Sequence, residues 1–283
     1  MTGLDTVLQH TEHPYLGRAR AYPFLKWAGG KRALVPEIAR HAPVSFEEYW
    51  EPFLGGGAVF FALDSRIRKA RLSDVNAELI LTYHMVKRET DALVKRLKVH
   101  SAKHALDQYY YRVRAQHSHK ESVEVAARFI YLNKTCFNGL YRVNSAGLFN
   151  VPMGRYKNPA ICDEANLHAA CKVLRKAQLR FGDFAKIAPA ARDFIYCDPP
   201  YDGAFAAYDA GGFGEDDQRR LRDAVEKWRA AGAMVMISNS DTPLIRNLYK
   251  AKHFKLHKVK APRNINCKSN GRAPAAELII TSY

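Results

Sequence analysis

A hydrophobic run that ends directly in three glycines constrains the fold of this 283-residue chain most strongly. Residues 46–53 have the composition of a buried strand, glycines 55–57 follow, and apolar residues at helical spacing come next. A second short strand is expected at 71–73, closing on Asp74. This order of strand, loop, helix and strand is the opening unit of a nucleotide-binding fold. It predicts an α/β protein with its ligand site at the strand ends.

The glycine loop and the acid after the second strand form the pattern of a nucleoside site. Gly55 lets the backbone approach a ligand closely, and the next helix would present its positive N-terminus. Asp74 follows roughly 20 residues later, the spacing at which an acid binds ribose hydroxyls. The sequence contains neither G-x-G-x-x-G nor a P-loop motif. A cofactor with a ribose but without a phosphate cradle, such as S-adenosylmethionine, fits this pattern best.

Two residues upstream of this unit are candidates for the same site. Trp27 would form a wall of the cofactor pocket, and Lys31 would bind a carboxylate. A tryptophan in an apolar segment is nearly as often part of the hydrophobic core, so both interpretations of Trp27 stay open.

The tetrapeptide Asp198-Pro199-Pro200-Tyr201 is the second decisive motif. It follows the apolar run 194–197, which predicts a buried strand with the tetrapeptide at its carboxyl end. Two prolines fix φ and remove two backbone donors, so the turn presents a carboxylate, a free carbonyl and an aromatic face. This array suits a flat base that carries an amino group. The alternative is a plain strand end with an ordinary turn acid.

The rest of the pattern predicts an insertion between two halves of the sheet. We expect a mobile leader at 1–21, a catalytic domain formed by 22–76 and 178–283, and a target-recognition region at 77–177, where helical patterns interleave basic and aromatic residues. An ordinary helical layer on the sheet is the alternative. The remaining expected elements are helices at 32–40, 59–63, 79–85, 91–100, 105–116, 123–132 and 215–231, strands at 179–181, 194–197, 233–237, 254–260 and 278–281, and a glycine-rich lid at 202–214.

Composition favours a polyanionic partner and a reducing compartment. The chain has 44 Lys and Arg against 28 Asp and Glu, a formal net charge of +16, which favours nucleic acid, although a basic but inert surface is the alternative. Its five cysteines include no C-x-x-C pair and no zinc-ligand spacing, so we expect reduced thiols and no metal. No apolar stretch approaches the roughly 18 residues of a membrane span, which predicts a cytoplasmic protein without a membrane partner.

Six motifs, in this order, resemble those of the Dam-type DNA adenine-N6 methyltransferases of class alpha. They are P-F-L-K-W-A-G-G-K at 23–31, E-P-F-L-G-G-G at 51–57, D-V-N at 74–76, F-N-G-L-Y-R at 137–142, N-V-P-M-G-R-Y-K at 150–157 and D-P-P-Y at 198–201. The resemblance runs from about residue 22 to the C-terminus. It implies a Rossmann-like mixed sheet with an inserted, mainly helical DNA-recognition domain. It also implies S-adenosylmethionine as methyl donor, S-adenosylhomocysteine as product, and double-stranded DNA with the site GATC as substrate.

The resemblance further implies roles for individual residues. The catalytic residues would be Asp198, Pro199 and Tyr201, and the cofactor-binding residues would be Trp27, Lys31, Phe53, Gly55, Asp74, Asp183, Phe184 and Asp198. The residues that contact DNA would be Lys26, Asn138, Leu140, Arg142, Pro152, Arg155 and Tyr156. Arg142 would read the outer guanine with its fork, whereas a phosphate clamp is the alternative for that residue alone. Phe137 stands where many relatives carry tyrosine, which keeps stacking but puts a hydroxyl contact in doubt.

The implied mechanism flips the target adenine out of the duplex and stacks it on Tyr201. Asp198 and the Pro199 carbonyl would then accept the hydrogens of N6 before a direct displacement. The enzyme would be a monomer or weak dimer, associated with the nucleoid of a bacterial or phage-infected cell. Three alternatives remain. They are a methyltransferase for another amino group (cytosine-N4, RNA adenine or protein glutamine, where Ser or Asn commonly stands at position 198), a catalytically silent DNA-binding regulator, and a nucleoside-cofactor enzyme with a small substrate.

Overall fold

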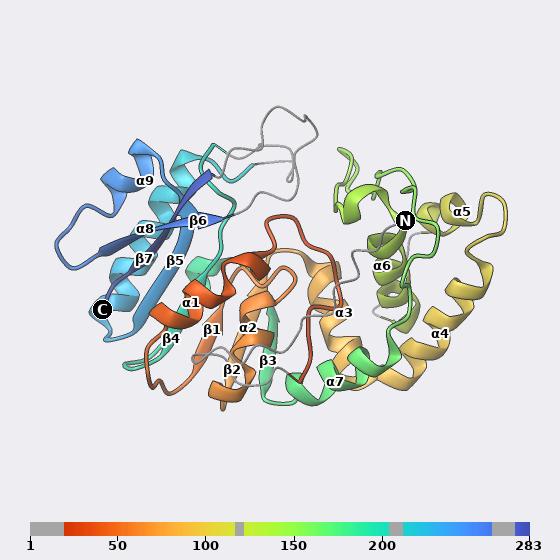
Figure 1. The fold of residues 1–283 in the computed structure, drawn as a ribbon, viewed down its shortest axis with the longest axis horizontal. Coiled ribbons are helices and arrows are strands. Elements are labelled where there is room, and N and C mark those ends of the chain that lie inside the picture. The colour runs from red at the N-terminus through yellow and green to blue at the C-terminus, as the bar shows by residue number, and fades with distance from the viewer. Residues whose placement is uncertain (1–19, 117–121, 204–211, 262–274) are drawn as a thin grey trace.

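A seven-stranded mixed sheet forms the centre of the computed structural model, which describes residues 20–116, 122–203, 212–261 and 275–283. The strand order is β3-β2-β1-β4-β5-β7-β6 (Figure 1). Neighbouring strands are parallel except for β7, which runs antiparallel to both β5 and β6. The strands are β1 (Tyr49–Glu51), β2 (Ala70–Asp74), β3 (Ala177–Phe181), β4 (Phe194–Cys197), β5 (Met234–Ser240), β6 (Lys255–Ala261) and β7 (Ala275–Thr281). The predicted Rossmann-like mixed sheet is confirmed.

Helices cover both faces of this sheet. They are α1 (Val35–His41), α2 (Ala58–Ala62), α3 (Ala77–Arg88), α4 (Thr90–Lys103), α5 (Tyr109–Ala115), α6 (Val123–Thr135), α7 (Glu164–Leu174), α8 (Glu215–Ala230) and α9 (Pro243–Leu248). Tyr49 of β1 lies in the hydrophobic core shared with α1 to α7, and the next residue, Trp50, lies in the core shared with α8 and α9. A strand that is buried on both faces reads as a continuous apolar run, as β4 does.

The strand ends that carry the motifs meet at one edge of the sheet. Glu51 pairs in register with Leu72, and Asp74 pairs with Phe181. The strand order reverses between β1 and β4, because β2 and β3 continue to one side and β5 to the other. Open α/β sheets bind ligands at such a switch point. The fold therefore brings the glycine loop and the D-P-P-Y turn to one place.

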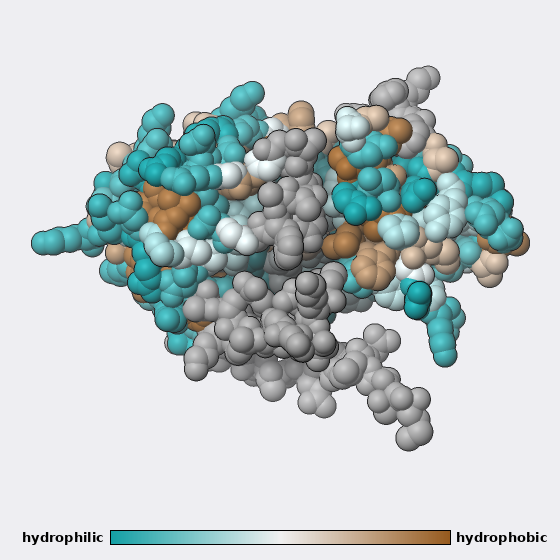
Figure 2. Space-filling model, turned by 90° about the horizontal axis from the view of Figure 1, so that it is seen from above, coloured by the Kyte–Doolittle hydropathy of each residue, from teal (hydrophilic) through white to brown (hydrophobic). Residues whose placement is uncertain are grey.

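Helices α4, α5 and α6 form a lobe beside the sheet (Figure 1). α3 packs on β2 and β3 as well as on α6, so it joins the lobe to the sheet. After α6 the chain folds back on itself, with antiparallel bridges from Cys136 to Met153 and from Val143 to Phe149. We call residues 136–156 the reading segment. Figure 2 shows hydrophobic side chains grouped among hydrophilic ones on the upper face of this lobe.

The structure differs from several predicted elements. The helices expected at 32–40 and 105–116 begin only at Val35 and Tyr109. The strand expected at 46–53 is limited to β1, and it ends before Pro52, which has no N–H to donate to the ladder. Helices α7 and α9 were not predicted, although each begins at a recognisable cap. The side chain of Asp163 accepts from the Asn166 N–H at the start of α7, and Thr242 caps α9.

Two predicted segments lie largely outside the described residues, namely positions 1–19 of the leader and 204–211 of the lid. Ala21, the last residue of the predicted leader, is buried in the core. Within the described part of the chain, no helix is long and apolar enough to cross a membrane. The same residues contain no group of three or more His, Cys, Asp or Glu arranged to hold a metal ion.

Candidate active site

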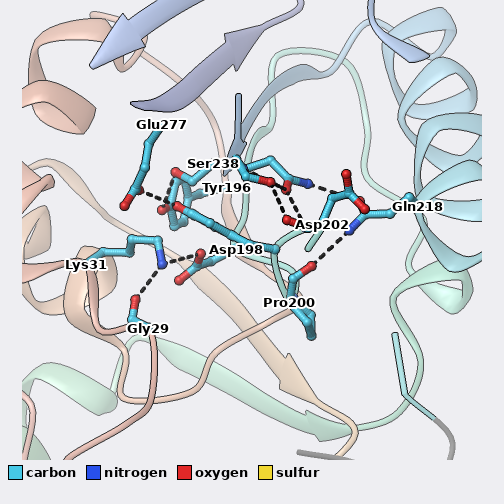
Figure 3. Close-up of polar contacts among 12 residues, drawn as sticks. Gly29, Lys31, Tyr196, Asp198, Pro200, Asp202, Gln218, Ser238 and Glu277 are labelled. Atoms are coloured by element: carbon cyan, nitrogen blue, oxygen red, sulfur yellow. Dashed lines mark hydrogen bonds and ion pairs between the residues drawn. The ribbon is translucent and has the colours of Figure 1, made fainter. Parts of the chain in front are cut away.

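The D-P-P-Y turn follows β4 and places its carboxylate against a lysine (Figure 3). Lys31 Nζ lies 2.8 Å from Asp198 Oδ1 and donates to the carbonyl of Gly29 at 2.5 Å. The Lys31 side chain is 7% exposed, and its Nζ lies 4.5 Å from the centroid of the Tyr201 ring. Burial raises the pKa of Asp198 to about 6, while the Lys31 ammonium opposes this shift. The turn therefore holds a carboxylate that is ionised at neutral pH and compensated by one cation.

Tyr201 is anchored through its hydroxyl. Its Oη donates to Glu277 Oε2 on β7 at 2.8 Å, and burial raises the pKa of this phenol well above its usual range. Tyr201 is partly buried, and Lys31 Nζ lies over its ring. Glu277 was not among the predicted site residues.

Two buried amides hold the backbone on both sides of Tyr201 (Figure 3). Gln218 of α8 donates from Nε2 to the carbonyl of Pro200 at 2.9 Å. Asn239 of β5 donates from Nδ2 to Gln218 Oε1 at 3.0 Å and accepts from the Asp202 N–H at 3.1 Å. The two amides are 1% and 0% exposed. Sequence reasoning assigned neither of them a role.

The glycine loop after β1 is fixed by side chains from β2 and α3. The Gly55 N–H donates to Asp74 Oδ2 at 2.9 Å, and the Gly55 carbonyl accepts from Tyr83 Oη at 3.1 Å. Asp74 Oδ1 accepts from the Asn76 N–H at 3.0 Å. Gly55 has φ +47°, and a Cβ there would lie 2.5 Å from Cδ1 of Trp27, so glycine is required. A carboxylate has further lone pairs, so Asp74 can hold the loop and still accept from hydroxyls.

A buried acid lies beneath this loop. Glu51 is 2% exposed, and its Oε2 accepts from Tyr49 Oη at 2.7 Å and from the Phe60 N–H at 3.1 Å. Burial raises the pKa of Glu51 to about 8, and the charge of Asp198 acts in the same direction. Glu51 therefore keeps its proton at neutral pH. It opens the E-P-F-L-G-G-G motif, yet sequence reasoning assigned it no role.

Aromatic and apolar side chains border the ends of β1, β2 and β3. The predicted cofactor residues Phe53 and Phe184 stack, with ring centroids 5.2 Å apart and an interplanar angle of 29°. Asp183, predicted for the same site, forms an ion pair with Arg220 of α8 at 3.1 Å. Val75 is 54% exposed directly after Asp74, and Phe181 at the end of β3 is 63% exposed. Neither Val75 nor Phe181 was predicted.

Trp27 joins the glycine loop to the reading segment. Its ring stacks on Tyr141, with centroids 5.8 Å apart, and on Phe129 of α6, with centroids 6.3 Å apart. The preceding residue is tied to the same helix, because the Lys26 N–H donates to Asn133 Oδ1 at 2.8 Å and the Lys26 carbonyl accepts from Asn133 Nδ2 at 2.7 Å. Trp27 packs against the core, as the alternative interpretation expected, and also borders Gly55.

The residues predicted to contact DNA lie together on the reading segment or against it. Arg142 is exposed, its Nε donates to Asn150 Oδ1 at 2.7 Å, and its carbonyl accepts from the Asn150 N–H at 3.1 Å. The Phe137 N–H donates to the Pro152 carbonyl at 2.9 Å, which closes the segment at its base. Asn138 has φ +55°, Leu140 is partly buried, Arg155 is exposed, and the Tyr156 ring lies 4.0 Å from Lys26 Nζ.

A family model supplies the identity of this arrangement. The model of the D12 class N6 adenine-specific DNA methyltransferases matches residues 27–265, which include the glycine loop, the reading segment and the D-P-P-Y turn. The chain belongs to this family. The resemblance inferred from six motifs is thereby confirmed.

Relatives within this family match over nearly the whole chain. The Type II methyltransferase M1.LlaDCHI of Lactococcus lactis subsp. cremoris is 40% identical over 275 residues, which cover 92% of this chain and 95% of that protein. The Type II methyltransferase M.MjaIII of Methanocaldococcus jannaschii is 40% identical over 287 residues, with 92% and 99% covered. The DNA adenine methylase of Escherichia coli (strain K12) is 36% identical over 265 residues, with 90% and 93% covered.

Membership of the D12 class settles the general chemistry. The chain is an adenine-specific DNA methyltransferase, with DNA as its substrate, and the family implies S-adenosylmethionine as methyl donor. This decides against the alternatives of a cytosine-N4, RNA-adenine or protein-glutamine methyltransferase.

Proposed function

We propose that this D12-class enzyme methylates N6 of a flipped-out adenine in duplex DNA, within the sequence GATC. The observation that supports this most is the D-P-P-Y turn. It combines the carboxylate of Asp198, whose pKa is about 6, with the partly exposed Tyr201, next to a loop suited to a nucleoside. The roles proposed for individual residues rest on these contacts and on the motifs.

The residues at the ends of β1, β2 and β3 fit S-adenosylmethionine. Gly55 brings the backbone close to the ligand, and the carboxylate of Asp74 at the end of β2 would accept from ribose hydroxyls. The exposed side chains of Val75 and Phe181 supply apolar surface for the adenine ring, with Asp183 close by. Trp27, Phe53 and Phe184 would wall the site, and Lys31 would meet the carboxylate. When bound, this cofactor supplies a methyl group on a positively charged sulfur.

The target base would be held by Tyr201. Flipping an adenine out of the duplex costs a few kcal/mol, and stacking on an aromatic ring returns about 1–3 kcal/mol of that cost. Glu277 holds the Tyr201 hydroxyl at 2.8 Å, so the ring is oriented before the base arrives. Lys31 Nζ lies 4.5 Å from the centroid of the same ring, so a cation–π contact also holds the ring in place.

Two acceptors would orient the amino group of the base. Asp198 accepts one N6 hydrogen, and the carbonyl of Pro199 accepts the other. The next carbonyl, that of Pro200, already accepts from Gln218, which leaves Pro199 as the neighbouring acceptor. Both hydrogen bonds increase the electron density on N6, favour an sp³ nitrogen and turn its lone pair toward the methyl group. Transfer would form the N6–CH₃ bond as the S–CH₃ bond breaks, with S-adenosylhomocysteine as the product, and N6 would lose one proton to the Asp198 carboxylate or to water. Preorganised acceptors supply most of the effect.

The reading segment would select the sequence. Asn150 holds Nε of Arg142, which leaves the two terminal nitrogens free for O6 and N7 of the outer guanine. The other DNA contacts would come from Lys26, Asn138, Leu140, Pro152, Arg155 and Tyr156. In this proposal residues 77–177 form the target-recognition region, and 22–76 with 178–283 form the catalytic domain. The net charge of +16 favours phosphate contacts, and the enzyme would act as a monomer or weak dimer.

The experiment that tests this proposal is a mapping of methylated adenines. Purified enzyme is incubated with methyl-labelled S-adenosylmethionine and unmethylated DNA, and the modified positions are sequenced. We expect label at N6 of adenine in GATC, and binding that weakens steeply with salt. Label at adenines in another sequence would refute the GATC assignment alone. A 2-aminopurine base at the target position whose fluorescence is unchanged on binding would refute base flipping.

A further inference from the structure

The turn that carries Asp198 and Tyr201 has few backbone donors of its own, because two of its residues are proline. A chain of two buried amides compensates for this. It runs from the Asp202 N–H through Asn239 and Gln218 to the Pro200 carbonyl, with heavy-atom distances of 3.1, 3.0 and 2.9 Å. The chain therefore contacts the backbone directly before and directly after Tyr201 (Figure 3).

We propose that Gln218 and Asn239 form a clamp that positions Tyr201 and the Pro199 carbonyl for methyl transfer. They are positioning residues, since neither would touch the base or the cofactor. This inference rests on the proposed function, in which the base stacks on Tyr201. It adds to that function a device outside the motifs, located on α8 and β5.

Backbone groups dictate the direction of this hydrogen-bond chain. Asn239 Oδ1 accepts from the N–H groups of Asp202 and Ser240, at 3.1 and 2.9 Å. Backbone N–H groups only donate, so the Asn239 oxygen must face them and its Nδ2 must face Gln218. Gln218 Oε1 is then the acceptor, and its Nε2 must donate to the Pro200 carbonyl. A carboxylate at either position would replace a donating amide nitrogen by an oxygen, so that two acceptors would face each other.

The clamp is completed at the far end of Tyr201. The hydroxyl of Tyr201 donates to Glu277 at 2.8 Å, so the residue is held at its preceding carbonyl, its following N–H and its ring. Asp202 is itself fixed, because its carbonyl accepts from Ser240 Oγ at 2.7 Å and its carboxylate accepts from Thr242 Oγ1 at 2.6 Å. Small displacements of reacting groups reduce rates strongly. We therefore expect that loss of the clamp lowers the rate of methyl transfer more than the affinity for DNA or cofactor.

The burial pattern of α8 argues against a purely apolar role for this position. The buried stripe of the helix contains Gln218, Leu221, Ala224, Val225 and Trp228. A leucine at 218 would continue that stripe, so helix packing alone does not require an amide. Because buried polar groups are costly unless they are bonded, the amide is best explained by the carbonyl that it holds.

The test compares three variants, Gln218→Leu, Gln218→Glu and Asn239→Asp, with Gln178→Leu as a matched control. Gln178 is exposed on β3 and pairs with Arg71 at 3.0 Å, remote from the turn. Each variant is assayed in a single turnover with saturating S-adenosylmethionine and DNA. Affinities for S-adenosylhomocysteine and DNA, the melting temperature, and 2-aminopurine fluorescence at the target base are measured in parallel. We expect a rate loss of about 10²-fold, with both affinities changed less than about threefold, and an altered fluorescence of the flipped base.

The outcomes separate the clamp from the general mechanism. Unchanged single-turnover rates in all three variants would overturn the clamp. A rate loss that follows equal losses in cofactor affinity and melting temperature would also overturn it, because that pattern marks a contact needed only for folding. Asp198→Ala, run in the same assay, tests the mechanism itself. If that variant is inactive while the clamp variants are active, only the clamp fails; if it stays active, the proposed mechanism fails.

Discussion

The D-P-P-Y turn and the reading segment carry the two halves of the proposed function, and they are held in different ways. Around the turn, Lys31, Gln218 and Asn239 are 7%, 1% and 0% exposed, and their bonds are enclosed by protein. On the reading segment Arg142 is exposed and bonds to Asn150 at 2.7 Å. In the proposed function, the groups for methyl transfer are therefore held in place before DNA binds, whereas the exposed Arg142 would be fixed by its contacts with DNA.

The largest expected effect comes from a variant in the buried D-P-P-Y turn. Asp198→Ala removes the acceptor for N6 and leaves the Lys31 ammonium without its partner. We expect methyl transfer to fall by at least about 10²–10³-fold, the loss typical of a missing oriented group, while most DNA affinity remains. A labelled-methyl assay measures the rate, and gel-shift titration measures binding. Turnover within tenfold of the parent enzyme would remove Asp198 from the mechanism.

The pH dependence of the rate should report the same carboxylate. Burial raises the pKa of Asp198 to about 6, and the ionised carboxylate accepts the N6 hydrogen far more strongly than the neutral acid does. The rate at saturating cofactor should therefore be level above pH 6 and should fall about tenfold per unit below it. Lys31→Met removes the charge that lowers this pKa, so the inflection should move upward. Lys69→Met, at an exposed position, is the control. An inflection that Lys31→Met leaves in place would contradict this assignment.

A variant in the exposed reading segment should show a smaller effect, and the effect should be on sequence discrimination. Arg142→Ala should reduce discrimination for the outer guanine by about 1–3 kcal/mol, because the paired contacts to O6 and N7 are lost. Single-turnover rates on GATC and on substituted oligonucleotides measure this. Arg68→Ala is a matched control, since Arg68 is exposed and precedes the amino-terminal end of β2, whereas the site lies at the carboxyl ends of the strands. Equal losses on all sequences would instead identify Arg142 as a phosphate contact.

Much of the architecture was predictable because it depends on local signals. The strand expected at 194–197 is β4, and the helix expected at 215–231 is α8 (Glu215–Ala230). Asp74 and Asp198 were expected at strand ends, and Asp74 ends β2 while Asp198 directly follows the continuous apolar run of β4.

The bonds that hold the site were not predictable, since they join distant positions. Lys26 and Asn133 are 107 residues apart, and Asp202 and Asn239 are 37 apart. A sequence signal existed for two of the residues that form these bonds. Gln218 lies on the apolar stripe of a helix, and Asn133 ends a run of buried residues. Such positions predict that a buried amide has a partner, but packing decides which backbone group that partner is.

The smallest expected effect sharpens the comparison within the reading segment itself. Asn150→Ala frees Nε of Arg142, so the guanidinium samples more orientations before it meets guanine. A net hydrogen bond contributes about 0.5–1.5 kcal/mol, and discrimination should fall by that amount, which is less than for Arg142→Ala. The double variant should match Arg142→Ala alone, because Asn150 acts only through the arginine. The salt dependence of binding should not change, since asparagine carries no charge. Additive losses in the double variant would mean that Asn150 contacts DNA independently, and the reading segment would then be less dependent on its internal bond than the structure suggests.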